Sequence, residues 1–127
     1  MERLVIYTDG SCSPNPGKGG WAYIAIFPDS EIWNNDTVNH TTNNIMELTA
    51  VIKALSDFKD TKYFLIYSDS LYVINCAENK WKRNKNTELW KQYDILSKDK
   101  DIIFKWVKGH NGNHYNELVD KLAKHII

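Results

Sequence analysis

Four acidic residues stand where an ordinary fold has little need of a carboxylate. Asp9 follows the apolar and aromatic run of residues 4–7, and Asp69 follows a similar run that ends at residue 68. Because strand interiors disfavour Asp, both acids are predicted at strand ends. Glu47 lies near the start of a helical pattern, and Asp120 lies in a later one. Carboxylates without a His or Cys cluster favour Mg2+ or Mn2+ over Zn2+, so the four acids predict a divalent-metal site.

Such a site favours one reaction above others. Two hard cations roughly 4 Å apart can stabilise both the attacking and the leaving oxygen of a phosphodiester, so we expect metal-dependent phosphodiester hydrolysis. Each acid also has an ordinary explanation. Glu47 could interact with the helix dipole, Asp69 could cap the next helix, and Asp120 could be a solvated helix residue. Four such coincidences together are less expected than one shared site.

The apolar pattern predicts a single domain over residues 1–127 that positions these acids. Strands are expected at about residues 3–8, 20–27, 31–35, 63–68 and 102–107, and helices at about 44–58, 70–77, 88–96 and 116–125. Asn43 or Asn44 is the expected cap of the first helix. The order of elements predicts an α/β fold with a mixed five-stranded sheet, three antiparallel strands and then parallel ones, flanked by helices. If the strands that lead to Asp9 and Asp69 are neighbours, the two carboxylates meet at their carboxyl ends.

Composition limits the classes of function. The chain of 127 residues is 43% hydrophobic and 25% charged and has a formal net charge of zero, which argues against binding nucleic acid by bulk charge alone. A basic stretch at residues 80–91 nevertheless contains Trp81 and Trp90. It could contact a polyanion, or it could be a solvated loop.

The sequence lacks the features of a membrane or secreted protein. No stretch is long and apolar enough to span a bilayer, and the first residues do not resemble a signal peptide. Cys12 and Cys76 are spaced like neither a zinc site nor a disulfide framework. We therefore expect a cytoplasmic protein that does not bind a membrane.

The same residues closely resemble the signatures of the type 1 ribonuclease H family. The resemblance covers nearly the whole chain in the family's order. The matching segments are residues 7–12, 15–17 and 19–21, then 41–48, then 68–70 with 72–73, and finally 106–110 with 116–117 and 120. The chain resembles a short member, because the basic handle of larger members is reduced here and no separate hybrid-binding domain is expected before residue 3. Leu71 stands where many members have a glutamine that helps to hold substrate.

The resemblance implies an enzyme, an endonuclease that hydrolyses the RNA strand of an RNA/DNA hybrid and leaves 5′-phosphate and 3′-hydroxyl ends. Asp9, Glu47, Asp69 and Asp120 would bind two Mg2+ ions, with Mn2+ as the alternative ion, and His110 would assist proton transfer or product departure. The implied substrate-binding residues are Gly10, Ser11, Cys12, Asn15, Thr42, Asn43, Asn44, Ser70, Trp81 and Trp90.

Two other functions remain open. One is a DNA-cutting nuclease of the same fold, against which the segment of residues 41–44 argues. The other is a hybrid-binding protein with weak or lost catalysis, against which the presence of all four acids argues. The protein is expected to be a monomer, and its protein partners are not predicted by the sequence.

Overall fold

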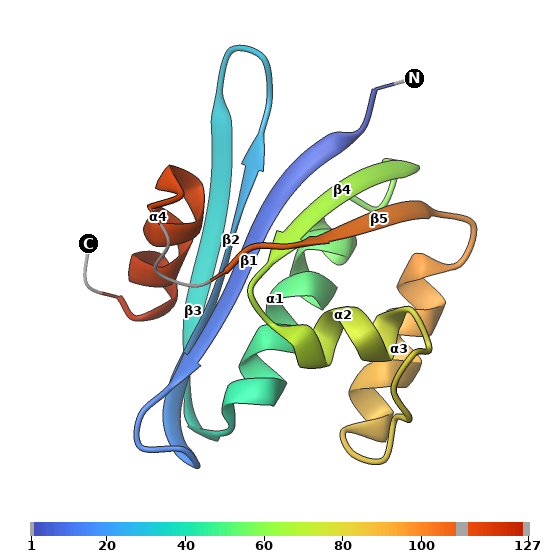
Figure 1. Cartoon of the computed structure of the whole chain (residues 1–127). Coiled ribbons are helices and arrows are strands. Elements are labelled where there is room, and N and C mark those ends of the chain that lie inside the picture. The colour runs from blue at the N-terminus through green and yellow to red at the C-terminus, as the bar shows by residue number, and fades with distance from the viewer. Residues whose placement is uncertain (1, 109–111, 126–127) are drawn as a thin grey trace.

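The computed structural model describes residues 2–108 and 112–125, which form one twisted sheet with helices on both faces (Figure 1). The strands are β1 (Leu4–Cys12), β2 (Gly17–Ile26), β3 (Glu31–Thr41), β4 (Tyr63–Ser68) and β5 (Asp101–Trp106), and the helices are α1 (Asn43–Asp57), α2 (Leu71–Ala77), α3 (Thr87–Ser97) and α4 (His114–Ala123). The strand order is β3-β2-β1-β4-β5. The first three strands pair antiparallel, and β4 and β5 join parallel, so the predicted mixed α/β sheet is confirmed.

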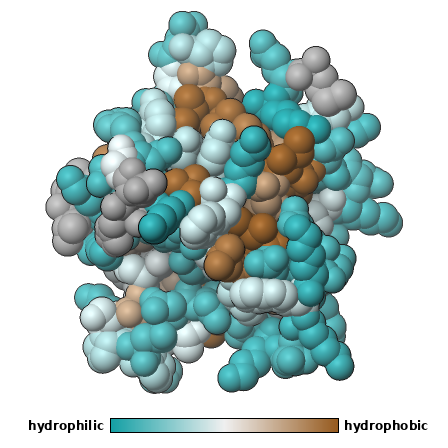
Figure 2. All heavy atoms as spheres, viewed as in Figure 1, coloured by the Kyte–Doolittle hydropathy of each residue, from teal (hydrophilic) through white to brown (hydrophobic). Residues whose placement is uncertain are grey.

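Alternation along the central strands gives each face of the sheet its own core. Figure 2 shows that apolar residues also gather in the middle of the face in view, surrounded by hydrophilic ones. Ile6, Phe64 and Ile66 are fully buried in the larger core beneath α1, α2 and α3. Each such side chain contributes about 1.5–3 kcal/mol relative to an exposed one. On the other face, α4 packs on a smaller core that includes Tyr7. Because side chains alternate along a strand, Asp9 points to the same face as Tyr7.

The first strand is longer than the sequence predicts. Its pairing with β4 ends at Tyr7, whereas its pairing with β2 continues to Cys12. Asp9 therefore lies inside β1, and the expectation that it ends the strand was wrong. The ladder between β1 and β2 is made by backbone hydrogen bonds, whatever the side chains are. The polar residues after Tyr7 therefore do not end the strand. Asp9 nonetheless lies just beyond the last β1–β4 pair, where the neighbouring strand has stopped.

Helix caps also differ from the sequence expectation. The Thr42 side chain accepts a hydrogen bond from Ile45 N at 3.2 Å, so Thr42 and not an asparagine caps α1. Ser70 caps α2 through Val73 N at 3.1 Å. The Asp69 carboxylate is therefore not the cap of the helix that follows it.

Candidate active site

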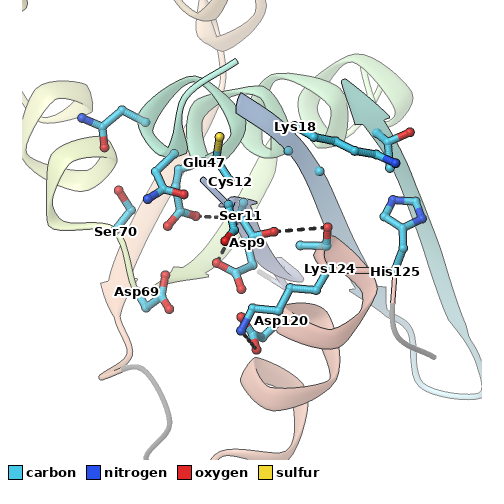
Figure 3. A pocket seen from close by; sticks show the side chains of 18 of the residues that line it. Asp9, Ser11, Cys12, Lys18, Glu47, Asp69, Ser70, Asp120, Lys124 and His125 are labelled. Carbon is cyan, nitrogen blue, oxygen red and sulfur yellow. Dashed lines mark hydrogen bonds and ion pairs between the residues drawn. The ribbon is translucent and has the colours of Figure 1, made fainter. Parts of the chain in front are cut away.

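Three of the four acids converge at the point where β4 ends. Oxygen atoms of Asp9, Glu47 and Asp69 all lie within 4.8 Å of one another. Asp9 comes from β1, Glu47 from α1, and Asp69 directly follows β4. Because β1 and β4 are parallel neighbours, their acids meet as expected. Figure 3 shows the three carboxylates turned toward a common space.

Gly10 allows the strand and the helix to approach closely enough to form this cluster. A Cβ atom at Gly10 would lie 2.3 Å from Glu47 N, so no side chain fits between β1 and α1 here. The backbone N–H of Gly10 donates to Glu47 Oε1 at 2.8 Å and to Asp9 Oδ1 at 2.9 Å. One amide group therefore orients two of the acids, as glycine permits at a close backbone approach.

The fourth acid flanks the cluster from the α4 side. Asp120 lies outside the tight group of three, and its Oδ2 forms an ion pair with Lys124 Nζ at 3.0 Å. It still lies close enough to Asp9 to affect that residue's ionisation. Lys124 is one residue that sequence reasoning missed, although its spacing of four residues from Asp120 on a helix was a usable signal.

Burial and repulsion keep these acids from ionising freely in the metal-free protein. Burial raises the pKa of Asp9 to about 9, and the charges of Asp69 and Asp120 add to the effect. Burial followed by the charge of Asp9 raises the pKa of Glu47 well above its usual value, and burial also raises the pKa of Asp69. Such a cluster favours a cation that neutralises it.

The donor set fits a hard divalent cation. Asp9 is only 2% exposed, and its Oδ2 is buried without a hydrogen-bond partner among the described residues. A buried carboxylate oxygen without a donor costs free energy unless another positive group reaches it. Mg2+ and Mn2+ prefer oxygen ligands of this kind.

The cluster opens into a groove of about 1030 Å3. Its lining includes six of the residues predicted to bind substrate, namely Gly10, Ser11, Cys12, Asn43, Asn44 and Ser70. It also includes Lys18, Tyr72, Lys124 and His125, which sequence reasoning did not select. Their positions depend on strand pairing and helix docking, for which only the Lys124 spacing left a signal in the sequence.

Two of the expected substrate contacts have a structural task as well. Asn15 Oδ1 accepts a hydrogen bond from Asn43 N at 3.2 Å, which ties the loop after β1 to the start of α1. The Cys12 thiol is buried and donates to Thr41 O at 3.4 Å. The Cys12 thiol is therefore engaged within the fold.

The two tryptophans of the basic stretch have different environments. Trp90 is 2% exposed, and its indole N–H donates to the Tyr72 hydroxyl at 3.0 Å. The expectation that Trp90 contacts substrate was wrong, because its ring is part of the core. Trp81 is 48% exposed and remains available. His110 lies outside the described residues.

Arg83 also belongs to the structure more than to a binding surface. Its guanidinium lies 4.5 Å from the centre of the Trp90 ring, donates to Cys76 O at 2.9 Å, and bridges both carboxylate oxygens of Asp94 at 2.9 and 2.8 Å. These contacts close the connection between α2 and α3. The cations of the basic stretch that remain available to a ligand are therefore fewer than its sequence suggests.

Comparison with known proteins assigns the family. The family model described as RNase H matches residues 1–127. The chain belongs to the ribonuclease H family. The ribonuclease H of Wolbachia pipientis wMel is 45% identical, and the match covers 99% of this chain and 96% of that protein. The ribonuclease H of Chlorobium luteolum is 41% identical over 100% of this chain and 97% of the relative. The chain is thus a ribonuclease H hydrolase.

Solved structures agree with the fold of this ribonuclease H. The N-terminal RNase H domain of a Mycobacterium tuberculosis protein superimposes with a TM-score of 0.86 at 22% identity, covering 99% of this chain and 94% of that one. The structure of LC11-RNase H1 in complex with an RNA/DNA hybrid gives a TM-score of 0.81 at 20% identity, covering 97% and 98%. At these identities the likeness concerns the fold. Among the described residues, no helix has the length and apolar character needed to cross a membrane.

Proposed function

We propose that this ribonuclease H cleaves the RNA strand of RNA/DNA hybrids with two Mg2+ or Mn2+ ions and leaves 5′-phosphate and 3′-hydroxyl ends. The observation that carries the proposal is the buried cluster of Asp9, Glu47 and Asp69, in which Asp9 Oδ2 has no partner among the described residues. Asp120 would complete the ligand set from α4. The structural relative LC11-RNase H1, solved with an RNA/DNA hybrid, supports the choice of substrate.

Different residues of the chain would have different roles in the reaction. Bound ions would supply positive charge to the attacking water and to the leaving 3′-oxygen. The carboxylates would hold those ions, and the Gly10 N–H already orients Asp9 and Glu47. His110 would assist proton transfer or product departure.

Recognition of the RNA strand would come from uncharged polar groups along the groove. Asn43, Asn44 and Ser70 line it beside the acids. Amide and hydroxyl groups can hydrogen-bond the 2′-hydroxyls and base edges that an A-like duplex displays in its wide minor groove. DNA lacks the 2′-hydroxyl, so these contacts would direct cleavage to RNA. We also propose that the enzyme acts in the cytoplasm as a monomer.

One experiment tests substrate and metal together. An end-labelled hybrid, duplex DNA and duplex RNA are each incubated with Mg2+, Mn2+ or EDTA. We expect cleavage of the RNA strand of the hybrid alone, with either ion and not with EDTA, and the nicked hybrid should be sealed by a ligase that requires 5′-phosphate and 3′-hydroxyl ends. Asp69→Asn should be inactive, and Asp60→Asn, which alters an exposed acid away from the groove, should be fully active.

Other outcomes would contradict the proposal. Equal cleavage of duplex DNA would favour a DNA-cutting nuclease, and hybrid binding without cleavage would favour a binding protein. Activity that persists in EDTA would exclude the metal-dependent mechanism.

A further inference from the structure

The groove continues beyond the acid cluster along β2 and the end of α4. Three cationic or titratable side chains line this extension, namely Lys18, Lys124 and His125, which we call the basic arm. In Figure 3, Lys18 and His125 lie on the opposite side of Asp9 from Asp69 and Ser70. Among the described residues, neither Lys18 nor His125 takes part in an ion pair.

The basic arm is held in place by close packing of the end of α4 on the sheet. A Cβ atom at Gly20 of β2 would lie 2.2 Å from Ala123 O and 3.2 Å from His125 Cδ2. Asn35 Nδ2 donates to Leu122 O at 2.9 Å, which anchors the same turn to β3. The backbone of His125 adopts a left-handed conformation with φ of 56°, and its N–H donates to Leu122 O at 3.1 Å. The turn after α4 therefore presents His125 beside Lys18 at a fixed place.

The two directions out of the acid cluster differ in charge. Toward α2 the lining residues are uncharged, namely Asn43, Asn44, Ser70, Leu71 and Tyr72. Toward β2 the lining includes the basic arm, together with the hydroxyl groups of Ser11, Ser13 and Thr37. A nucleic-acid strand carries a phosphate about every 3.4 Å of helix axis. A strand with one phosphate at the acids must therefore pass other phosphates along the groove.

We propose that the basic arm binds phosphates of the RNA strand next to the one that is cut, on one side of the cut only. The inference rests on the proposed function, because the strand in the groove is taken to be the RNA strand. Ammonium groups pair with phosphate oxygens, and imidazole N–H and hydroxyl groups can add hydrogen bonds. The acid cluster repels phosphates that carry no cation, so the basic arm offsets that repulsion where the strand leaves the cluster.

The contact should affect binding and not the chemical step. It is made equally in the ground state and in the transition state, so its removal raises KM and leaves kcat nearly unchanged. The double variant Lys18→Ala/His125→Ala should raise KM about 3- to 10-fold. It should also lower the slope of log affinity against log salt by about 1 for each phosphate that the variant no longer binds.

The test uses hybrids with one defined cut position and three designs of flank. One has full flanks, and in the other two the RNA strand is shortened on one side of the cut while the DNA strand is kept. The double variant should be impaired on the full hybrid and on one shortened hybrid. On the other shortened hybrid, which lacks the phosphates that the basic arm binds, wild type and variant should be alike.

Matched controls separate this effect from a general loss of charge. Lys98→Ala removes a lysine at the end of α3, away from the groove, and should change neither KM nor salt slope. Lys18→Arg should keep most of the affinity. The proposal is wrong if wild type and variant still differ on both hybrids with a shortened RNA strand. It is also wrong if the difference disappears when the DNA strand is shortened instead of the RNA strand.

The experiments distinguish an error in the inference about the basic arm from an error in the proposed function. If the wild-type protein cuts hybrids but the double variant has unchanged KM and salt slope, only the basic arm is refuted. If the wild-type protein does not cut hybrids, the proposed function fails. Fluorescence anisotropy with the same hybrids then decides about the basic arm, and equal Kd values for wild type and variant would overturn it.

Discussion

Replacing Asp9 with asparagine should inactivate the enzyme and stabilise its metal-free form. Asn keeps an oxygen that can accept the Gly10 N–H, which now bonds Asp9 Oδ1 at 2.9 Å, but it has no charge to bind cations. In the metal-free protein the pKa of Asp9 is raised from 3.8 to about 9, mainly by burial and then by the charge of Asp69. Folding at neutral pH therefore requires Asp9 to take up a proton, which costs free energy.

The size of the effect follows from this shift. The folded state holds the Asp9 proton up to about pH 9, whereas the unfolded chain releases it near 3.8. Between these values the folded state binds more protons, so stability falls as pH rises. At pH 7, keeping Asp9 protonated in the folded state costs about 4 kcal/mol, because each pH unit above the pKa of the unfolded chain contributes about 1.36 kcal/mol. A buried amide costs about 1–2 kcal/mol, so Asp9→Asn should gain about 2 kcal/mol, or about 6–10 °C in Tm.

Thermal unfolding in EDTA at about pH 5, 7 and 9 measures this gain. The difference in Tm between Asp9→Asn and wild type should grow with pH, and added Mg2+ should raise the Tm of wild type much more than that of the variant. The control Asp60→Asn changes an exposed acid and should leave both unchanged. A variant that is less stable than wild type at pH 7, or that keeps the wild-type pH slope, would refute the reasoning.

Three further predictions concern Arg83, the two tryptophans and His110. Arg83→Ala should lower the free energy of unfolding by about 2–3 kcal/mol in chemical denaturation, because it removes a cation–π contact and charged hydrogen bonds, with little change in KM; a large rise in KM without loss of stability would contradict its structural role. Trp90→Ala should lower the free energy of unfolding by about 3–5 kcal/mol in the same assay. Trp81→Ala should leave stability nearly unchanged and raise KM. The reverse pattern would show that the roles assigned to the two tryptophans are exchanged. His110→Ala should slow turnover by about 10²- to 10⁴-fold in steady-state assays and still bind metal, so loss of metal binding would identify it as a ligand.

The sequence predicts the sheet and the meeting of its acids because both depend on simple periodicities. Apolar runs before Asp9 and Asp69 mark two buried strands, and parallel neighbours bring their ends together. The end of β1 could not be predicted in this way. Its ladder to β2 continues through polar residues to Cys12, because backbone pairing is independent of the side chains that break the pattern.

Other details depend on contacts that no local pattern encodes. Trp81 and Trp90 both stand among lysines in the sequence, yet only Trp90 meets the Tyr72 hydroxyl and enters the core. The α1 cap is a similar case. Thr42, Asn43 and Asn44 are all good caps, and the register of the preceding strand decides which one begins the helix.

The order of strands in the sheet also has a consequence for folding kinetics. The antiparallel β1–β2–β3 meander is built from local pairings, whereas β1 and β4 pair between residues about sixty positions apart, as in Leu4 with Phe64. Closing so long a loop is slow relative to hairpin formation. Until that closure, Asp9 and Asp69 are on separate parts of the chain. Recovery of nuclease activity during refolding should therefore follow the slowest long-range step, and a cleavage assay would report complete folding where a probe of the meander reports only its beginning.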